Sequence, residues 1–177
     1  SAVSFDQLEP ALALADRTDA FLALTGDKHF LLADEGDAFL MYRIEGANWI
    51  VMGDPVGNED RWSDLLWKLR EKADAAQGRL QLYQIGARTL PQAIDLGLSI
   101  VKYGEEAEVD LASFSLAGPQ AKSLRHAERR AAQEGAEFAV IAAADVPAHI
   151  AELRAVSDDW LRAKKQREKA FSLGSFD

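Results

Sequence analysis

Three carboxylates on one predicted strand are the side chains of this sequence best placed to do chemistry. Glu106, Glu108 and Asp110 alternate with apolar residues, and this period of two is typical of a half-buried strand. Neighbouring carboxylates would lie about 6.6 Å apart on one face, where like charges raise each other's pKa values unless cations intervene. The pattern has two interpretations, a solvated sheet face or an electrostatic contact with a basic helix or a cationic group. No histidine is nearby, so we predict no metal site.

A basic helix is predicted directly after that strand. Pro119 stands where a first helical residue would be, and Gly135 occupies the position of a left-handed cap. Its cations share one face at 100° per residue, and a second basic cluster follows near the C-terminus. Both are either solvated surfaces or phosphate-binding sites, and RNA and lipid head groups are equally compatible. The candidate phosphate-binding residues are Lys122, Arg125, Arg129, Arg130, Arg162, Lys164, Lys165 and Arg167.

The segment Gly53–Gly57 (GDPVG) joins a predicted strand to a predicted helix, a junction at which backbone N–H groups can bind an anion. Asp54, Glu59 and Asp60 would instead repel a phosphate there, and we therefore predict no cofactor. The two glycines are explained by a turn that requires positive φ. Asp54 either caps that turn or joins the three carboxylates above in a polar site.

The composition is that of a globular chain of one domain's length. It has 177 residues, 48% of them hydrophobic, and no cysteine, which excludes disulfides and thiolate metal sites. No apolar run approaches the roughly 20 residues of a membrane span. The net charge of −9 argues against extensive nucleic-acid binding, and 12 acidic against 3 basic residues in positions 1–60 place the excess acid there.

The order of the predicted elements is that of an α+β protein. Three strands at 29–33, 38–44 and 48–52 form an antiparallel meander with turns at 35–37 and 45–47. The remaining predicted strands are 80–85, 98–103, 106–111 and 137–142. Helices are predicted at 4–14, 61–77, 90–96 and 119–135 and from Asp145 onward, with Asn58 as the N-cap before the second of them.

Four pieces of this sequence carry a resemblance to a known family. They are GDPVG at 53–57, YGEEAEVDLASFSLAG at 103–118, KSLRHAERRAAQEG at 122–135, and SDDWL with EKAFSLGSFD within 157–177. In order and wording they resemble the cytosolic catalytic region of the bacterial aminoacyl-phosphatidylglycerol synthases, the multiple peptide resistance factor family. The sequence departs from the family at 127–129. The family would have an asparagine before the arginine, whereas this sequence reads Ala-Glu-Arg.

The resemblance implies an N-acetyltransferase-like fold, the first of a tandem pair. Residues 1–142 would form the first acyltransferase-like domain, 143–170 a basic linking helix, and 171–177 the start of a second domain. In such a fold the GDPVG junction would hold the pyrophosphate of coenzyme A, so its acidic residues indicate a domain that has lost this binding. Transmembrane helices upstream would attach the enzyme to the membrane, with this region at the cytoplasmic face of the bacterial inner membrane.

The implied activity is transfer of an amino acid, lysine or alanine, from aminoacyl-tRNA to the hydroxyl of phosphatidylglycerol. The resemblance places most catalytic residues in the second domain, so none is assigned here and we expect this chain alone to be inactive. On this view the carboxylates could contact a cationic aminoacyl group, and the partners are aminoacyl-tRNA, phosphatidylglycerol and the second domain. Two alternatives remain, a non-catalytic lipid- or tRNA-binding module and a coenzyme A-dependent N-acyltransferase.

Overall fold

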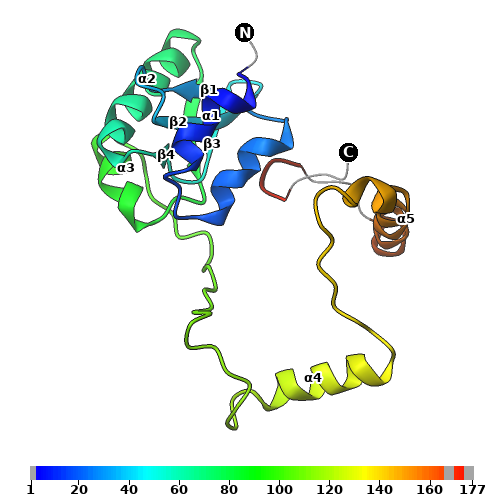
Figure 1. Ribbon diagram of the computed structural model, residues 1–177. Coiled ribbons are helices and arrows are strands. Elements are labelled where there is room, and N and C mark those ends of the chain that lie inside the picture. Colours follow the sequence, from blue (N-terminus) through cyan, green and yellow to red (C-terminus); the bar gives the residue numbers. More distant parts are fainter. Residues whose placement is uncertain (1–2, 166–169, 174–177) are drawn as a thin grey trace. The chain divides into compact units, whose positions relative to one another are not determined.

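The computed structural model describes residues 3–165 and 170–173 (Figure 1). The chain forms two compact units, Ser1–Tyr103 together with Leu161–Asp177, and Gly104–Trp160. We call them unit 1 and unit 2. They divide at a different place from the domains predicted from the sequence, and those domain boundaries stay a prediction.

Unit 1 is built on a mixed five-stranded sheet with the order β1-β2-β3-β5, in which β4 also pairs with β2. The strands are β1 (His29–Leu32), β2 (Ala38–Glu45), β3 (Asn48–Met52), β4 (Val56–Gly57) and β5 (Arg79–Tyr83). β1, β2 and β3 form the predicted antiparallel meander, whereas β5 runs parallel to β3. A parallel neighbour needs a crossover connection, which the helix between β3 and β5 provides.

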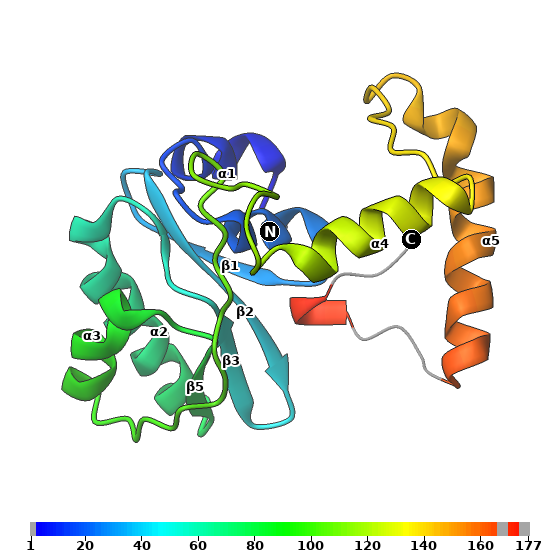
Figure 2. The same cartoon turned by 90° about the horizontal axis from the view of Figure 1, so that it is seen from below.

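Helices cover both faces of this sheet (Figure 2). On one face α2 (Trp62–Ala75) and α3 (Leu90–Asp95) form a layer, and Leu65, Leu66 and Leu69 of α2 pack in a buried cluster with Leu40 and Val51. The apolar residues of α2 recur at three- and four-residue spacing, so they form one stripe that faces the sheet. The predictions of both helices are thereby confirmed.

The opposite face of the sheet is covered by α1 (Phe5–Leu12) and a 3₁₀ helix, η1 (Thr18–Thr25). Leu8 and Ala11 of α1 pack with Phe39, Met41 and Met52 of the sheet. β2 is therefore buried on both faces, because Phe39 and Met41 enter this cluster while Leu40 enters the other. Full burial of each such side chain contributes about 1.5–3 kcal/mol.

Unit 2 contains the helix α4 (Lys122–Gln133) and most of α5 (Val146–Lys164). Gly135 has a φ of +81°, which confirms the predicted left-handed cap. The helix begins at Lys122, however, so Pro119 is not its first residue as predicted. Both helices were expected from their apolar periodicity, and α5 begins one residue after the predicted start.

The strands predicted at 98–103, 106–111 and 137–142 are wrong, since none of these residues is in a strand. A period-2 pattern produces a strand only when a neighbouring strand satisfies its backbone and another layer covers its apolar face. Here most apolar members of the pattern are open to solvent, with Leu111 83% and Phe138 93% exposed, although Leu98 packs against a buried cluster. Within the described residues no helix is long and apolar enough to cross a membrane.

Candidate functional site

The GDPVG segment does not run directly into a helix but first forms β4, whose Val56 and Gly57 pair with Phe39 and Ala38 of β2. Gly53 and Gly57 have φ values of +70° and +94°, which confirms that the turn requires positive φ. At Gly57 a Cβ atom would also collide with the carbonyl oxygen of Asp37. The N–H of Gly53 donates to the carbonyl of Tyr83 at 2.8 Å and ties the turn to β5.

The start of the following helix is occupied by the chain's own polar groups. The side chain of Asn58 accepts a hydrogen bond of 3.1 Å from the N–H of Asp60, which confirms Asn58 as an N-cap. It caps a short 3₁₀ helix, η2 (Glu59–Arg61), that leads into α2. Glu59 and Asp60 lie in its first turn, where carboxylates favour the positive end of the helix and would repel a phosphate.

Asp54 is a buried carboxylate that joins this turn to the segment before α3. It is only 7% exposed, and its Oδ1 accepts hydrogen bonds from the N–H of Gly86 at 2.8 Å and the hydroxyl of Thr89 at 2.6 Å. Its Oδ2 has no hydrogen-bond partner among the described residues. Asp54 therefore acts as an internal cap for the segment that carries Arg88, 32 to 35 residues away, and not for its own turn as the turn-capping interpretation expected.

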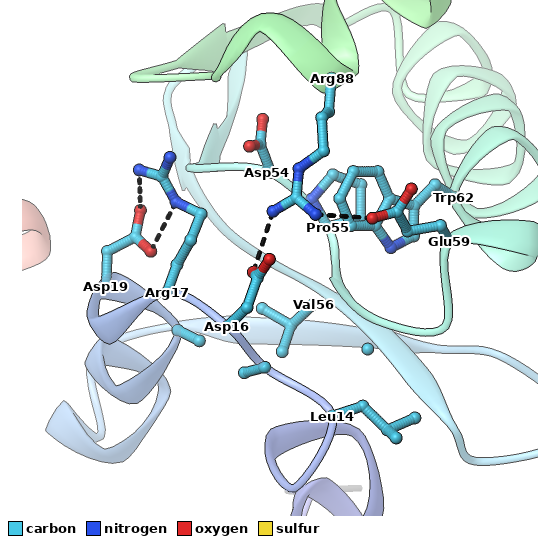
Figure 3. A pocket seen from close by; sticks show the side chains of 13 residues that line it. Leu14, Asp16, Arg17, Asp19, Asp54, Pro55, Val56, Glu59, Trp62 and Arg88 are labelled. Atoms are coloured by element: carbon cyan, nitrogen blue, oxygen red, sulfur yellow. Dashed lines mark hydrogen bonds and ion pairs between the residues drawn. The ribbon is translucent and has the colours of Figure 1, made fainter.

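Arg88 lies at the centre of the charged cluster beside this turn (Figure 3). Its Nη2 donates to Asp16 at 2.9 Å, its Nη1 donates to Glu59 at 2.6 Å, and its guanidinium lies 5.5 Å from the ring centre of Trp62. The hydrogen bond with Asp16 raises the pKa of Arg88 further, and the same bond lowers the pKa of Asp16. The guanidinium thus links three segments that are distant in the sequence.

The cluster borders a cavity of about 90 Å³, room for a few water molecules. Its charged lining consists of four carboxylates (Asp16, Asp19, Asp54 and Glu59) and two guanidiniums (Arg17 and Arg88), a formal balance of −2. Arg17 and Asp19 pair with each other at 3.0 Å (Figure 3). The net negative lining makes this a poor site for a phosphate and a better one for water or a cation.

Sequence reasoning missed Arg88, Asp16, Arg17 and Asp19 as members of this cluster. The ion pair between Arg88 and Asp16 spans 72 residues and has no periodic signature. The available signal was the isolation of Arg88, which is the one basic residue between Arg79 and Lys102.

The three carboxylates predicted to share a strand face lie instead in an irregular, exposed segment of unit 2. Asp110 folds back on its own turn, where it accepts hydrogen bonds from the N–H of Ala112 at 3.0 Å and the hydroxyl of Ser113 at 2.7 Å. These bonds, above all the one from Ser113, lower the pKa of Asp110. Glu106 and Glu108 are exposed, and the described residues contain no group of His, Cys, Asp and Glu that could hold a metal ion.

The cationic residues of α4 divide between internal contacts and solvent. Arg125 donates through Nη1 to the carbonyl oxygens of Leu116 and Gly118, and so fastens the turn before the helix. Arg129 donates to the carbonyl of Arg125 at 3.2 Å, and Arg130 pairs with Glu134 at 2.8 Å. Lys122 is exposed at the first turn.

The second basic cluster begins in the last turn of α5. Arg162 and Lys164 belong to that helix, and Lys165 follows it with a positive φ of 51°. Lys164 and Lys165 are exposed, whereas Arg167 lies outside the described residues. Ligand binding by either cluster remains a prediction.

Residues 11–177 match the family model described as "Phosphatidylglycerol lysyltransferase, C-terminal". The chain is 35% identical over 156 residues, 88% of its length, to the phosphatidylglycerol lysyltransferases of Staphylococcus xylosus and Bacillus subtilis. The aligned part is 18% of each relative, so the chain spans less than a fifth of their length.

Two solved structures are similar over nearly the whole chain. One is the C-terminal domain of a putative lysylphosphatidylglycerol synthetase from Agrobacterium fabrum, with a TM-score of 0.90, 41% identity and 97% of this chain covered. The other is L-PGS from Bacillus licheniformis, with a TM-score of 0.82, 31% identity and 98% coverage. This chain covers 55% of each of those chains.

Proposed function

This chain belongs to the phosphatidylglycerol lysyltransferase family, and from that premise we propose that it is part of an enzyme that transfers an amino acid from aminoacyl-tRNA to phosphatidylglycerol. In this reaction the lipid hydroxyl attacks the aminoacyl carbonyl, a new ester forms, and the ribose hydroxyl of the tRNA leaves. The amino acid proposed is lysine, after the names of the relatives, with alanine as the alternative.

The arrangement of unit 1 supports an N-acetyltransferase-like fold as the first of two acyltransferase-like domains. Its antiparallel strands β1–β3 are followed by a helical crossover to β5, which runs parallel to β3. Helices cover both faces of this sheet. The second domain would then require residues that the longer relatives possess, since this chain covers 55% of the solved chains.

One observation favours this proposal over a coenzyme A-dependent acyltransferase. It is the set of carboxylates that lines the cavity beside the GDPVG turn. A pyrophosphate at that position would meet Asp54, Glu59 and the capped end of η2, with a formal charge balance of −2 around the cavity. An acyl group delivered on tRNA needs no such pyrophosphate pocket. Calorimetric titration with acetyl-coenzyme A should therefore show no binding, and tight binding would favour the N-acyltransferase instead.

We assign the catalytic residues mainly to the second domain, because no buried nucleophile and base pair lines the cavity beside the GDPVG turn among the described residues. The purified 177-residue chain should therefore not form aminoacyl-phosphatidylglycerol from charged tRNA and phosphatidylglycerol vesicles. Formation of that lipid by this chain alone would overturn the assignment.

The exposed lysines of the two basic clusters are the proposed contacts to phosphate groups, of tRNA or of the lipid. Lys122, Lys164 and Lys165 are exposed, whereas Arg125 already serves the turn before α4. Replacing the three lysines with glutamate should weaken binding to tRNA or anionic vesicles and flatten its salt dependence. Replacing Lys72 with glutamate, an exposed lysine in α2, is the matched control. Unchanged binding in the triple variant would exclude these lysines.

A chain that binds tRNA or anionic lipid without catalysing transfer would be the non-catalytic binding module named above. Adding back the remaining part of a relative's catalytic region separates the two functions, because only an enzyme fragment can restore transfer. In the cell we propose that the chain works at the cytoplasmic face of the bacterial inner membrane, beside its lipid substrate and held there by transmembrane helices of a longer protein.

A further inference from the structure

The short 3₁₀ segment Ala170–Ser172 belongs to unit 1 but lies far in sequence from the residues of that unit that it contacts. The N–H of Phe171 donates a hydrogen bond of 2.7 Å to Oδ2 of Asp27, across 144 residues. The ring of Phe171 lies 6.1 Å from the ring of Tyr83, and Nζ of Lys28 lies 5.7 Å from the centre of the Phe171 ring. The ring also packs against the buried cluster formed by α1, η1 and the sheet.

Asp27 is held in place by its other contacts. Its Oδ1 accepts hydrogen bonds of 2.6 Å from both Nζ of Lys28 and the hydroxyl of Thr25. Arg43 lies 3.9 Å from Oδ2, the oxygen that accepts from Phe171. The side chain of Lys28 is fully buried, so its ammonium depends on this carboxylate and on Thr25. These contacts hold the carboxylate with Oδ2 directed at the Phe171 amide.

Phe171 adopts a backbone conformation that its own residue type disfavours. Its φ of +66° and ψ of −81° lie outside the regions that L-residues with a Cβ atom normally occupy. Such a conformation persists only when its surroundings determine it. The hydrogen bond to Asp27 and the contacts of the ring supply that determination.

We infer that Asp27, Lys28 and Tyr83 form an anchoring site in the N-terminal part of unit 1 for the kinked segment around Phe171, with Asp27 as its positioning residue. The site recognises one main-chain N–H through a carboxylate oxygen and one aromatic ring through an ammonium group and a second ring. It goes beyond the proposed function, because it concerns where this chain's own segment is held and not which substrate is bound.

Amide exchange followed by NMR on the 177-residue chain tests the inference. In Asp27→Ala the amide of Phe171 should exchange at least about tenfold faster, since hydrogen bonds to charged groups are among the stronger ones. Amides of β2 and β3 should keep their protection. Asp34→Ala is the matched control, because Asp34 is an exposed carboxylate that pairs with Lys68 at the surface. An unchanged rate at Phe171 in Asp27→Ala would overturn the inference.

Asp27→Ala leaves the buried Lys28 without its carboxylate, so Phe171→Ala provides a second test that leaves Asp27, Lys28 and Tyr83 unchanged. This variant keeps the main-chain N–H and removes the ring, and residues 170–173 should again exchange about tenfold faster or more. If the segment keeps its protection in Phe171→Ala, the ring has no anchoring role. If β2 and β3 lose as much protection as the segment in Asp27→Ala, the residue stabilises the whole unit and the anchoring site is refuted.

Discussion

Asp54 and Thr89 share a buried hydrogen bond of 2.6 Å, although 35 residues separate them in the sequence. Thr89 is completely buried, so its hydroxyl depends on a partner within the protein. The carboxylate that supplies this partner also accepts the N–H of Gly86. Arg88 lies between Gly86 and Thr89 in the sequence. Its position, and therefore the charged cluster around it, depends on Asp54.

We expect Thr89→Val to lower the free energy of unfolding by about 1–3 kcal/mol, because it removes a buried hydroxyl and leaves a carboxylate under-satisfied. Thr89→Ser keeps the donor and is the matched control, with a smaller loss from the missing methyl group. Urea denaturation followed by tryptophan fluorescence measures both. Equal stability of Thr89→Val and the unmodified chain would contradict the importance of this bond.

Gly57→Ala should destabilise unit 1 by about 2–4 kcal/mol, since the new methyl group collides with the carbonyl of Asp37 at a φ of +94°. Gly36→Ala provides the comparison. Gly36 also has a positive φ, but a Cβ atom there meets nothing within 4 Å. Its cost should be only about 1 kcal/mol. Thermal denaturation of the two variants should rank them in this order, and the reverse order would refute the steric argument.

Arg88→Ala should cost about 1 kcal/mol of stability, because the ion pairs with Asp16 and Glu59 are exposed to solvent and the contact with Trp62 is the better shielded part. The more specific consequence is electrostatic. Without Arg88 the pKa of Asp16 should rise toward its ordinary value, which an NMR titration of the carboxyl carbon detects. Arg130→Ala, which removes another exposed ion pair, should leave Asp16 unaffected.

The ionisation of Asp27 should make the free energy of unfolding depend on pH. Its pKa is lowered to about 2 against the desolvating effect of burial, chiefly by the hydrogen bond from Lys28 and then by those from Thr25 and Phe171. A depressed pKa contributes stability that is fully present above the unfolded value near 4 and is lost as the pH falls through about 2. The difference in unfolding temperature between the chain and Asp27→Asn should therefore be constant above pH 5 and shrink toward pH 2. A difference independent of pH would show that the charge is unimportant.

Arg125→Ala should loosen the turn before α4, since the guanidinium donates to the carbonyls of Leu116 and Gly118. Amide exchange in residues 115–121 should accelerate by about fivefold or more, the equivalent of one lost hydrogen bond of about 1 kcal/mol. Lys122→Ala, which changes an exposed cation three residues earlier on the helix, should change this exchange little. A similar acceleration in both variants would mean that the positive charge of the helix, and not the two bonds, orders the turn.

The elements of unit 1 could be predicted because their signals are local. The alternation in 29–52, the glycine turns between those strands and the leucine stripe of α2 each agree with the structure. The same rules failed at 98–103, which also belongs to unit 1, and at 106–111 and 137–142. The pattern of a strand was present there, but the neighbouring strand and covering layer that complete a sheet were not.

The candidate site was less predictable than the fold. The sequence singled out Asp54 and the two glycines because they stand at a strand end, and the turn roles of the glycines followed from residue type, whereas the contacts of Asp54 with Gly86 and Thr89 did not. The ion pairs of Arg88 join residues from three distant segments, and nothing local marks them as partners. Arg125 was grouped with the exposed cations by its position on the helix, yet its guanidinium is used internally.

The burial of β2 on both faces has a consequence for how its alignment with its neighbours is chosen. A shift by one residue would move residues 38–41, the buried half of the strand, to the opposite faces without exposing an apolar side chain to water, so within this half the hydrophobic effect alone penalises the error weakly. The correct alignment must then depend on side-chain volume and on the strand's two ends. Both ends are glycine turns, with Gly36 at a φ of +75° and Gly46 at +57°, and a change in the length of either loop would permit misaligned pairing.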